Sequence, residues 1–551
     1  MPPVTAGRAA SSSRAATGDA SSVTTAVLIL LGLCALAVPV ALVPVPPVLD
    51  YPNHLARMCL LAGAAESGPL SRMYEVDWSL ASTNVGIDLI AAAVGPVVGC
   101  EPLARMLLGA SVVLPPLGAV ALHAAVFRGL HWWQAGFAML AWSATALSGF
   151  VNFQVGLGLA LLAAALDARL PVAKPATVFA VRLLIGGGIF VVHLFAGLFY
   201  GALLAALAFG ANPVAWSDRV TLWRRTLRAL GAAGVGFGIP LLLFLLLASV
   251  MPAERPEAVD VQDWTGYALD RKAIALLTPF LSYRLGVDLL FPVMLWATAR
   301  FVALRSATRT HSGLLLAAGG LALLAVAMPR HLSGVVAVDW RFPIMATVAL
   351  VTAVQPVMAT TRRALIAAAA LAGMSLLRTG WIGGIWLERA ADTEAVERVL
   401  LSLPAGASLV PVRHFEPPGT TPLGRLVAAS FQSDWHYPLL AIPRRQAFVP
   451  TLFSMPGIQP IRVRPPYDAW AVPSGSPAPV HLLREGVEGL RVANWQLDRF
   501  PRDYAYLEHW RSFDYVLVVN ADRPDAIGGD LPPELELVAD EGFARLYRIR
   551  R

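Results

Sequence analysis

The sequence predicts a polytopic α-helical membrane protein with a soluble domain at its C-terminus, and three observations lead to this prediction. Hydrophobic residues make up 56% of the chain and charged residues only 14%, whereas a soluble domain has about 45–50% and about 25%. Apolar runs that could cross a bilayer recur between residues 23 and 386. From about residue 388 the chain is rich in prolines, charges and turn residues.

The first apolar run, residues 23–43, is long enough to cross about 30 Å of hydrocarbon. No small-residue cleavage site follows it, so we expect an uncleaved anchor and not a signal peptide. The preceding residues 1–21 are rich in Ser, Ala and Thr and predict a disordered tail. Arg8 and Arg14 place this tail in the cytoplasm by the positive-inside rule, so the loop after the run faces outward.

That outer loop, residues 46–102, is expected to hold two interfacial helices, at 52–66 and 84–98. The second is short for a span, and counting it as one would move the basic loops that follow it to the outside. Cys59 and Cys100 are the only plausible disulfide pair, because the third cysteine lies in the first apolar run. The cysteines show no CxxC motif and no spacing typical of a zinc site.

Ten further spans complete a predicted transmembrane domain over residues 22–387. They lie at about 103–127, 133–149, 153–168, 177–192, 194–211, 229–250, 286–303, 312–328, 342–359 and 364–386. With the first they make eleven, an odd number that puts the C-terminus outside. Most basic residues between them then fall at cytoplasmic ends, namely Arg128, Arg169, Lys174, Arg182, Arg219, Arg224, Arg225, Arg228, Arg300, Arg305, Arg309, Arg362 and Arg363. The formal net charge of +7 therefore indicates membrane orientation and not a nucleic-acid partner.

Residues 388–551 predict a small α/β or α+β domain on the outer face. The stretch "TEAVERVLLSLPAGASLVPV" is typical of a helix, a Pro-Ala-Gly break and a strand. Further strands are expected at "FDYVLVVN", "LELVAD" and "FARLYRIR". No glycine-rich phosphate loop is present in the sequence, so nothing indicates nucleotide binding.

Polar side chains gather at the outer ends of the predicted spans, where charged groups beside a membrane are costly unless they are solvated or used. The stretch "DYPNHLAR" carries Asp50, His54 and Arg57, and the second interfacial helix carries Asn84 and Asp88, which share one face. The other outer turns hold Asn152 and Gln154, then His193, then Arg330, His331, Asp339 and Arg341. Their convergence on one side of the membrane predicts a functional site.

Each of these residues also has a structural interpretation. Asp50 could cap the first interfacial helix, since it precedes a proline at an early helical position. His54 and Arg57 could form the solvated face of that helix. The others could hydrogen-bond between spans, stabilise a turn or contact lipid headgroups; these are Asn152, His193, Arg330, His331 and Arg341.

In its layout the chain resembles the GT-C superfamily of polyprenyl-phosphate-sugar-dependent glycosyltransferases. The shared features are a first span ending in an outer loop with an acidic residue, interfacial helices, many short spans and a C-terminal outer domain. The stretches "DYPNHLAR", "GFVNFQVGLGLALL" and "VHLFAGLFY" are also similar to uncharacterised bacterial membrane proteins of this layout. The resemblance implies a multi-pass protein of the bacterial cytoplasmic membrane, with its N-terminus cytoplasmic and its C-terminal domain periplasmic.

The resemblance also implies a role for Asp50, because the first-loop acidic residue of GT-C enzymes acts as catalytic base or binds a metal. Metal-dependent members carry a D-x-D or E-x-D pair, and this loop contains Glu75-Val-Asp77. Such a triplet is common by chance, so a metal-independent site without cofactors, with Asp50 alone as the catalytic residue, is the favoured interpretation.

A carboxylate can act as general base on an acceptor hydroxyl while the sugar C1 loses the lipid phosphate, which inverts C1 in a single displacement. Arg330, Arg341 or Arg57 would bind the departing phosphate, assisted by His331 or His193. The outer loop 251–285, which contains Trp264 and Tyr267, would close over the sugar. The acceptor would be an envelope glycan, a lipid or a protein.

Two alternatives to the enzyme stay open. A transporter or flippase of lipid-linked glycans should carry polar residues near the midplane and matching broken helices in its two halves. A non-catalytic membrane scaffold, whose outer domain binds a partner, predicts that Asp50 is dispensable.

Overall fold

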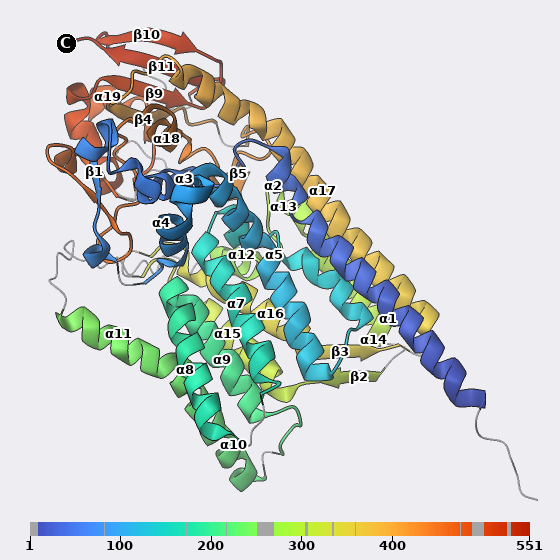
Figure 1. Cartoon of the computed structure of the whole chain (residues 1–551). Helices are drawn as coiled ribbons and strands as arrows, with labels where there is room; N and C mark the ends of the chain where they lie inside the picture. Colours follow the sequence, from blue (N-terminus) through green and yellow to red (C-terminus); the bar gives the residue numbers. More distant parts are fainter. Residues whose placement is uncertain are drawn as a thin grey trace, which may run out of the picture.

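The computed structural model describes residues 9–81, 83–170, 174–215, 217–250, 269–303, 307–332, 335–358, 360–417, 419–473, 475–486, 501–525 and 531–551. Most of the described chain is helical, and a five-stranded sheet lies at one end of the molecule (Figure 1). Long helices extend from the region below this sheet to the opposite end. Described residues between 46 and 102 meet C-terminal segments at the sheet end.

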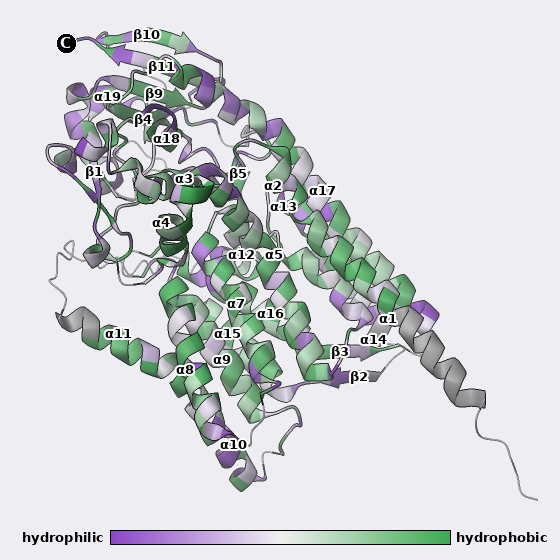
Figure 2. Ribbon diagram, in the orientation of Figure 1, coloured by the Kyte–Doolittle hydropathy of each residue, from purple (hydrophilic) through white to green (hydrophobic). Residues whose placement is uncertain are grey.

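Five described helices are long and apolar enough to cross a membrane. They are Ser22–Leu42, Cys100–Phe127, Pro175–Val192, Arg219–Leu246 and Thr361–Leu400. Shorter apolar helices lie at Gly86–Val98, Val151–Asp167, Leu194–Phe209, Leu285–Thr298 and Ser312–Ala327. Figure 2 shows hydrophobic residues along most of these helices and more hydrophilic ones around the sheet. The protein is therefore helical, with several helices suited to a bilayer.

The described part of residues 1–127 contains five α-helices and one short strand. α1 (Ala9–Ala35) and α2 (Val38–Leu42) lead to α3 (Tyr51–Cys59), β1 (Tyr74–Val76), α4 (Gly86–Val98) and α5 (Cys100–Phe127). α1 begins within the stretch for which the sequence predicts a disordered tail, and its many alanines explain the helix, because Ala has the highest helix propensity. Residues 1–8 of that tail lie outside the described residues.

The middle of the chain forms a bundle. Its helices are α7 (Val151–Asp167), α8 (Pro175–Val192), α9 (Leu194–Phe209), α10 (Arg219–Ala233), α11 (Ile239–Val250), α12 (Leu269–Leu277), α13 (Leu285–Asp288), α14 (Leu290–Ala303), α15 (Ser312–Ala327) and α16 (Val338–Thr352). At the end far from the large sheet, β2 (Ala307–Thr310) pairs with β3 (Val354–Val357). α17 (Thr361–Leu400) then passes along α1 and α2 toward the sheet.

The span expected at 133–149 is not a single helix, and this part of the prediction is wrong. A 3₁₀ segment, Trp132–Leu140, is followed by α6 (Ala144–Leu147). Nearly all of its side chains are buried, and it packs against α17 and α5. Irregular backbone at membrane depth is tolerated where protein covers it, and hydropathy alone cannot distinguish such a segment from a lipid-facing span.

The large sheet has the strand order β10-β11-β9-β4-β8. Its strands are β4 (Leu409–Arg413), β8 (Ala478–Pro479), β9 (Tyr515–Val519), β10 (Leu535–Asp540) and β11 (Ala544–Ile549). β4 pairs in parallel with β8 and β9, whereas β11 pairs antiparallel with β9 and β10. β4 and β9 are buried along their whole length. The sequence predicts four of these strands, β4, β9, β10 and β11, and these predictions are confirmed.

The predicted boundary between residues 387 and 388 falls inside α17. This 40-residue helix is continuous and carries the chain from the bundle to the sheet. In addition, β1 pairs with β7 (Ile461–Val463). Buried residues of α3 and of the C-terminal region, such as Leu55 and Leu440, belong to one hydrophobic core. The first loop and the C-terminal region therefore pack as one body.

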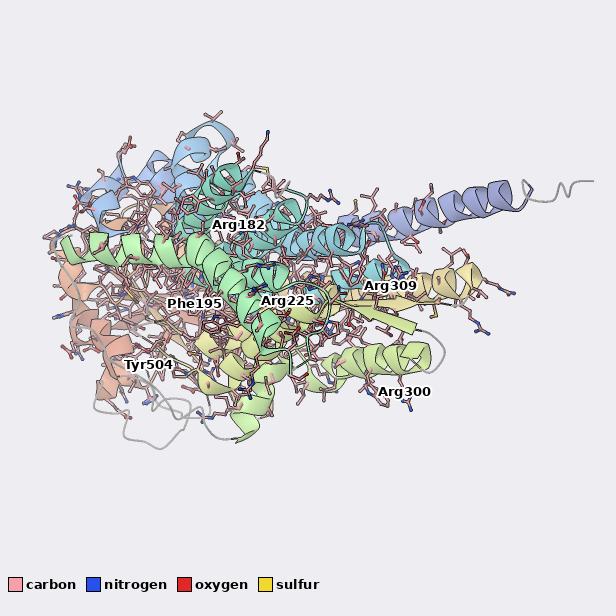
Figure 3. All side chains as sticks on the ribbon, turned by 90° about the horizontal axis from the view of Figure 1, so that it is seen from below. Arg182, Phe195, Arg225, Arg300, Arg309 and Tyr504 are labelled. Atoms are coloured by element: carbon pink, nitrogen blue, oxygen red, sulfur yellow. A yellow bond between two sulfur atoms is a disulfide. The ribbon has the colours of Figure 1, made fainter. Side chains whose placement is uncertain are left out.

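The helix ends farthest from the large sheet are rich in basic residues. Figure 3 views the molecule from this side and labels Arg182, Arg225, Arg300 and Arg309. Other basic residues near these ends are Arg128, Arg169, Lys174, Arg219, Arg224, Arg228, Arg362 and Arg363.

Candidate functional site

Asp50 lies immediately before α3, but its side chain does not cap that helix through any described backbone group. Its Oδ1 instead lies 3.3 Å from Nε2 of His436, and the Asp50 side chain is 13% exposed. The backbone N–H of Asp50 donates to the carbonyl oxygen of Ser148, 3.2 Å away. The carboxylate is therefore partly exposed and lies beside His436 and not at the start of α3, which argues against the capping interpretation.

The turn between α6 and α7 closes against Asp50 from one side. Gly149 in this turn has φ +82°, and a Cβ atom added to it would lie 2.9 Å from both the Cβ and the backbone nitrogen of Asp50. A glycine is the residue that permits both this left-handed conformation and this approach.

His54 links the same turn to α3. Its Nε2 lies 2.9 Å from the carbonyl oxygen of Gly149, and its Nδ1 lies 3.3 Å from an Arg57 NH2 group. Because a carbonyl only accepts and a guanidinium only donates, Nε2 carries the proton and Nδ1 accepts. Burial, reinforced by the charge of Arg57, lowers the pKa of His54 to about 3. His54 is thus a buried neutral side chain, and the solvated-face interpretation is wrong for it.

Arg57 and Asp88 form a buried ion pair that joins α3 to α4. Arg57 Nε lies 2.7 Å from Oδ1 of Asp88, and a terminal nitrogen lies 3.4 Å from Oδ2. The two side chains are 1% and 0% exposed. Arg57 is therefore not on a solvated face, and each of the two charges already has its partner inside the protein.

Asn152 holds the start of α4. Its Oδ1 accepts from the backbone N–H of Ile87 at 2.9 Å, and its Nδ2 donates to the carbonyl oxygen of Asn84 at 2.7 Å. Asn84 has φ +63° and supplies this backbone contact. These contacts favour the structural interpretation of Asn152, namely a hydrogen-bonding residue between elements.

Arg341 lies within a group of aromatic rings near Asp50. Its guanidinium carbon is 4.6 Å from the ring centre of Phe150, which directly follows Gly149, and 5.3 Å from that of Phe195. One terminal nitrogen donates to the carbonyl oxygens of Val336 and Ala337, both at 2.8 Å. The guanidinium also interacts electrostatically with the carboxylates of Asp50 and Asp339. A buried cation therefore lies beside the Asp50 turn.

His193 caps α9 next to this group. Its Nδ1 accepts from the backbone N–H of Phe195 at 3.1 Å, and its ring packs edge-on against Phe153 at 5.4 Å. It also interacts electrostatically with Arg341. His193 is therefore both a turn-forming residue and a neighbour of the candidate site.

Further cations surround Asp339 on α16. Nζ of Lys272 lies 3.2 Å from Oδ2 of Asp339 and donates to the carbonyl oxygen of Met328 at 2.6 Å. Arg330 lies over the rings of Trp340 and Phe431, at 5.6 and 5.3 Å. The next residue along the chain, His331, is also buried. Lys272 and Arg330 thus both interact electrostatically with Asp339.

Part of the expected lid, residues 251–285, lies outside the described residues, including Trp264 and Tyr267. Its described part begins with α12, which brings Lys272 to Asp339. At its end, the Tyr283 hydroxyl accepts from Nε1 of Trp386 on α17 at 2.8 Å. This part of the loop is thus packed into the bundle.

The E-x-D pair of the first loop lies at the β1–β7 pairing. Arg462 lies 3.3 Å from a carboxylate oxygen of Glu75 and 2.8 Å from one of Asp77, and Arg464 lies 3.0 Å from Glu75. Arginines thus neutralise both carboxylates. Within the described ranges, no group of three or more His, Cys, Asp and Glu side chains is placed to hold a metal ion.

The structure connects the expected residues in different ways. Asp50, His54, His193 and Arg341 belong to one contiguous group, whereas Arg57, Asp88 and Asn152 hold α3 and α4 in place around it. His436 and Lys272 are not among the site residues predicted from the sequence, although Lys272 lies in the loop expected to close over the sugar. Comparison of the chain with protein-family models, curated proteins and solved structures found no match.

Proposed function

We propose that the protein is a glycosyltransferase of the bacterial cytoplasmic membrane. It transfers a sugar from a polyprenyl-phosphate donor to an envelope glycan, lipid or protein acceptor at the outer face. The observation that carries this proposal is the partly exposed carboxylate of Asp50 beside the buried guanidinium of Arg341.

In this reaction Asp50 takes the proton of an acceptor hydroxyl as the hydroxyl oxygen attacks the sugar C1. The C1–oxygen bond to the phosphate breaks, and the polyprenyl phosphate leaves with the electron pair. Configuration at C1 inverts because one displacement occurs. The step needs a fixed base and fixed positive charge, and no redox partner.

The cations near Asp50 suit the leaving group. Arg341 is surrounded by apolar rings, where its interaction with a developing negative charge is stronger than in water. Its planar guanidinium can meet phosphate oxygens in pairs. Lys272 and Arg330 supply further positive charge around Asp339. Arg57 is the weaker candidate, because Asp88 already engages it.

The orientation of the bundle supports an outer site. Basic residues concentrate at the helix ends far from the sheet, as expected for cytoplasmic ends. The candidate site lies toward the sheet end, together with a disulfide between Cys59 and Cys100, and disulfides persist in oxidising compartments. In this proposal the N-terminus is cytoplasmic, the chain crosses the membrane about eleven times, and the region from residue 388 on is periplasmic.

The test is transfer by purified wild type and Asp50→Asn from a panel of radiolabelled polyprenyl-phosphate sugars. We expect the variant to lose about 10²- to 10⁴-fold in rate, the usual contribution of a general base. Asp468→Asn, which changes a carboxylate on the C-terminal surface, serves as the matched control and should transfer normally. A folded Asp50→Asn protein with wild-type activity would remove the base assignment, and a wild type inactive with every donor would refute the transferase.

A further inference from the structure

Asn53, in the first turn of α3, is held in one orientation by the C-terminal region. The backbone N–H of Phe453 donates to Oδ1 of Asn53 at 3.0 Å. Nδ2 of the same amide then faces the carbonyl oxygen of Thr451 at 3.4 Å and Nδ1 of His436 at 3.5 Å. Asn53 is fully buried, so the amide has a defined donor side and a defined acceptor side.

This orientation determines which nitrogen of His436 carries a proton. The amide Nδ2 can only donate, so Nδ1 of His436 accepts from it and the proton of the neutral ring lies on Nε2. Nε2 is the atom that lies 3.3 Å from Oδ1 of Asp50. Catalytic contacts are often long before substrate binds and shorten in the reactive complex. The ring therefore presents an N–H group to the carboxylate.

The imidazole of His436 is also held sterically. Its ring packs edge-on against Phe453 at 5.0 Å, and Phe453 in turn packs edge-on against His54 at 6.3 Å. His436 is 4% exposed. Asp50 thus lies between the turn at Gly149 and a histidine supplied by the C-terminal region, 386 residues further along the chain.

We propose that His436 is a positioning residue for Asp50, so that the C-terminal region completes the reaction site. The inference rests on the proposed function. A donor on Oδ1 fixes the rotation of the carboxylate and leaves Oδ2 to take the proton of the acceptor hydroxyl. Misplacing a reacting group by about 1 Å can cost about 100-fold in rate.

The test compares His436→Phe with His436→Gln in the full-length protein. Phenylalanine removes the N–H donor, whereas the glutamine amide can bring a donor close to the former Nε2 position. We expect kcat for transfer to fall about 10- to 100-fold in His436→Phe, with KM for the donor within about twofold. Glutamine should restore most of kcat. His481→Phe, which alters another buried histidine of the C-terminal region, is the matched control.

The outcomes separate the two proposals. The transferase proposal holds if wild type transfers the sugar and Asp50→Asn does not. If His436→Phe then has the same kcat as the His481→Phe control, His436 does not position Asp50. Equal losses in the Phe and Gln variants would assign His436 a purely structural role and also overturn the inference. If His436→Phe does not fold, His436→Asn replaces it, because its amide is too short to reach Asp50. An inactive wild type would refute the transferase, and this inference with it.

Discussion

At the scale of single residues, the contact between Gly149 and Asp50 gives the most direct prediction. A Cβ atom at position 149 meets backbone and Cβ atoms of Asp50, and the left-handed conformation adds about 1–2 kcal/mol of strain for alanine. Gly149→Ala should therefore displace the carboxylate and lower kcat by about 10- to 100-fold. Gly187→Ala, at a glycine with open space around it, is the control in the same transfer assay. Wild-type kcat in Gly149→Ala would show that the position of the carboxylate is not critical.

His54 gives a prediction about pH. Its pKa is lowered to about 3 in the folded protein, first by burial and then by Arg57, so protons bind better to the unfolded chain. Stability from His54 is complete above pH 6.5 and declines as the pH falls toward 3, by at most about 1.4 kcal/mol per pH unit. Unfolding measured between pH 7 and 4.5 should show this decline. His54→Gln should reduce the slope, and the exposed His509→Gln should not; equal slopes in all three proteins would contradict the assignment.

The same residues show what sequence could predict at this scale. The stretch "DYPNHLAR" indicated Asp50 and His54 as candidate site residues, because polar groups beside a membrane are costly unless they are solvated or used. Their partners were not predictable. The Arg57–Asp88 pair and the Asn152 contacts depend on how α3, α4 and α7 pack, and periodicity within one element carries no information about that packing.

At the scale of elements, the disulfide ties the end of α3 to the start of α5. Cys59 and Cys100 are 41 residues apart, and closing a loop of this size stabilises the folded state by about 4 kcal/mol in the chain-entropy view. Denatured, unreduced protein should react with one equivalent of maleimide, at Cys34, and with three after reduction. The double variant Cys59→Ser/Cys100→Ser should unfold at a lower temperature, and Cys34→Ser should not. Three reactive thiols before reduction would show that the bond does not form.

The boundaries of helices and strands agree with the prediction where the hydrophobic periodicity and the composition change clearly along the sequence. Four of the five strands of the large sheet, β4, β9, β10 and β11, lie inside the predicted segments to within one residue, because alternation and β-branched residues mark them. The two-residue strand β8 was not predicted. The segment 133–149 differs, because a buried 3₁₀ segment is as apolar as a span. The continuous α17 was also not predicted, since its composition changes near residue 388 while its helical structure does not.

At the scale of the whole molecule, the sequence could not place the C-terminal region against the first loop. His436 lies in a region whose composition is that of an ordinary soluble domain, and nothing local distinguishes it from other histidines. Its contact with Asp50 arises from tertiary packing, in which β1 pairs with β7 and α3 lies against the segment around Tyr437. The type and order of the elements were thus more predictable than the set of residues that meet at the site.

The orientation of the whole molecule can be tested with single cysteines in a background lacking the native three. Leu537, exposed on β10, lies at the sheet end, and Gly129, exposed after α5, lies among the basic ends. Because basic residues are retained in the cytoplasm, a membrane-impermeant maleimide should label Leu537→Cys in intact cells. Gly129→Cys should react only after permeabilisation. The reverse pattern would place Asp50 on the cytoplasmic side, where the outer-face transfer proposed for it cannot occur.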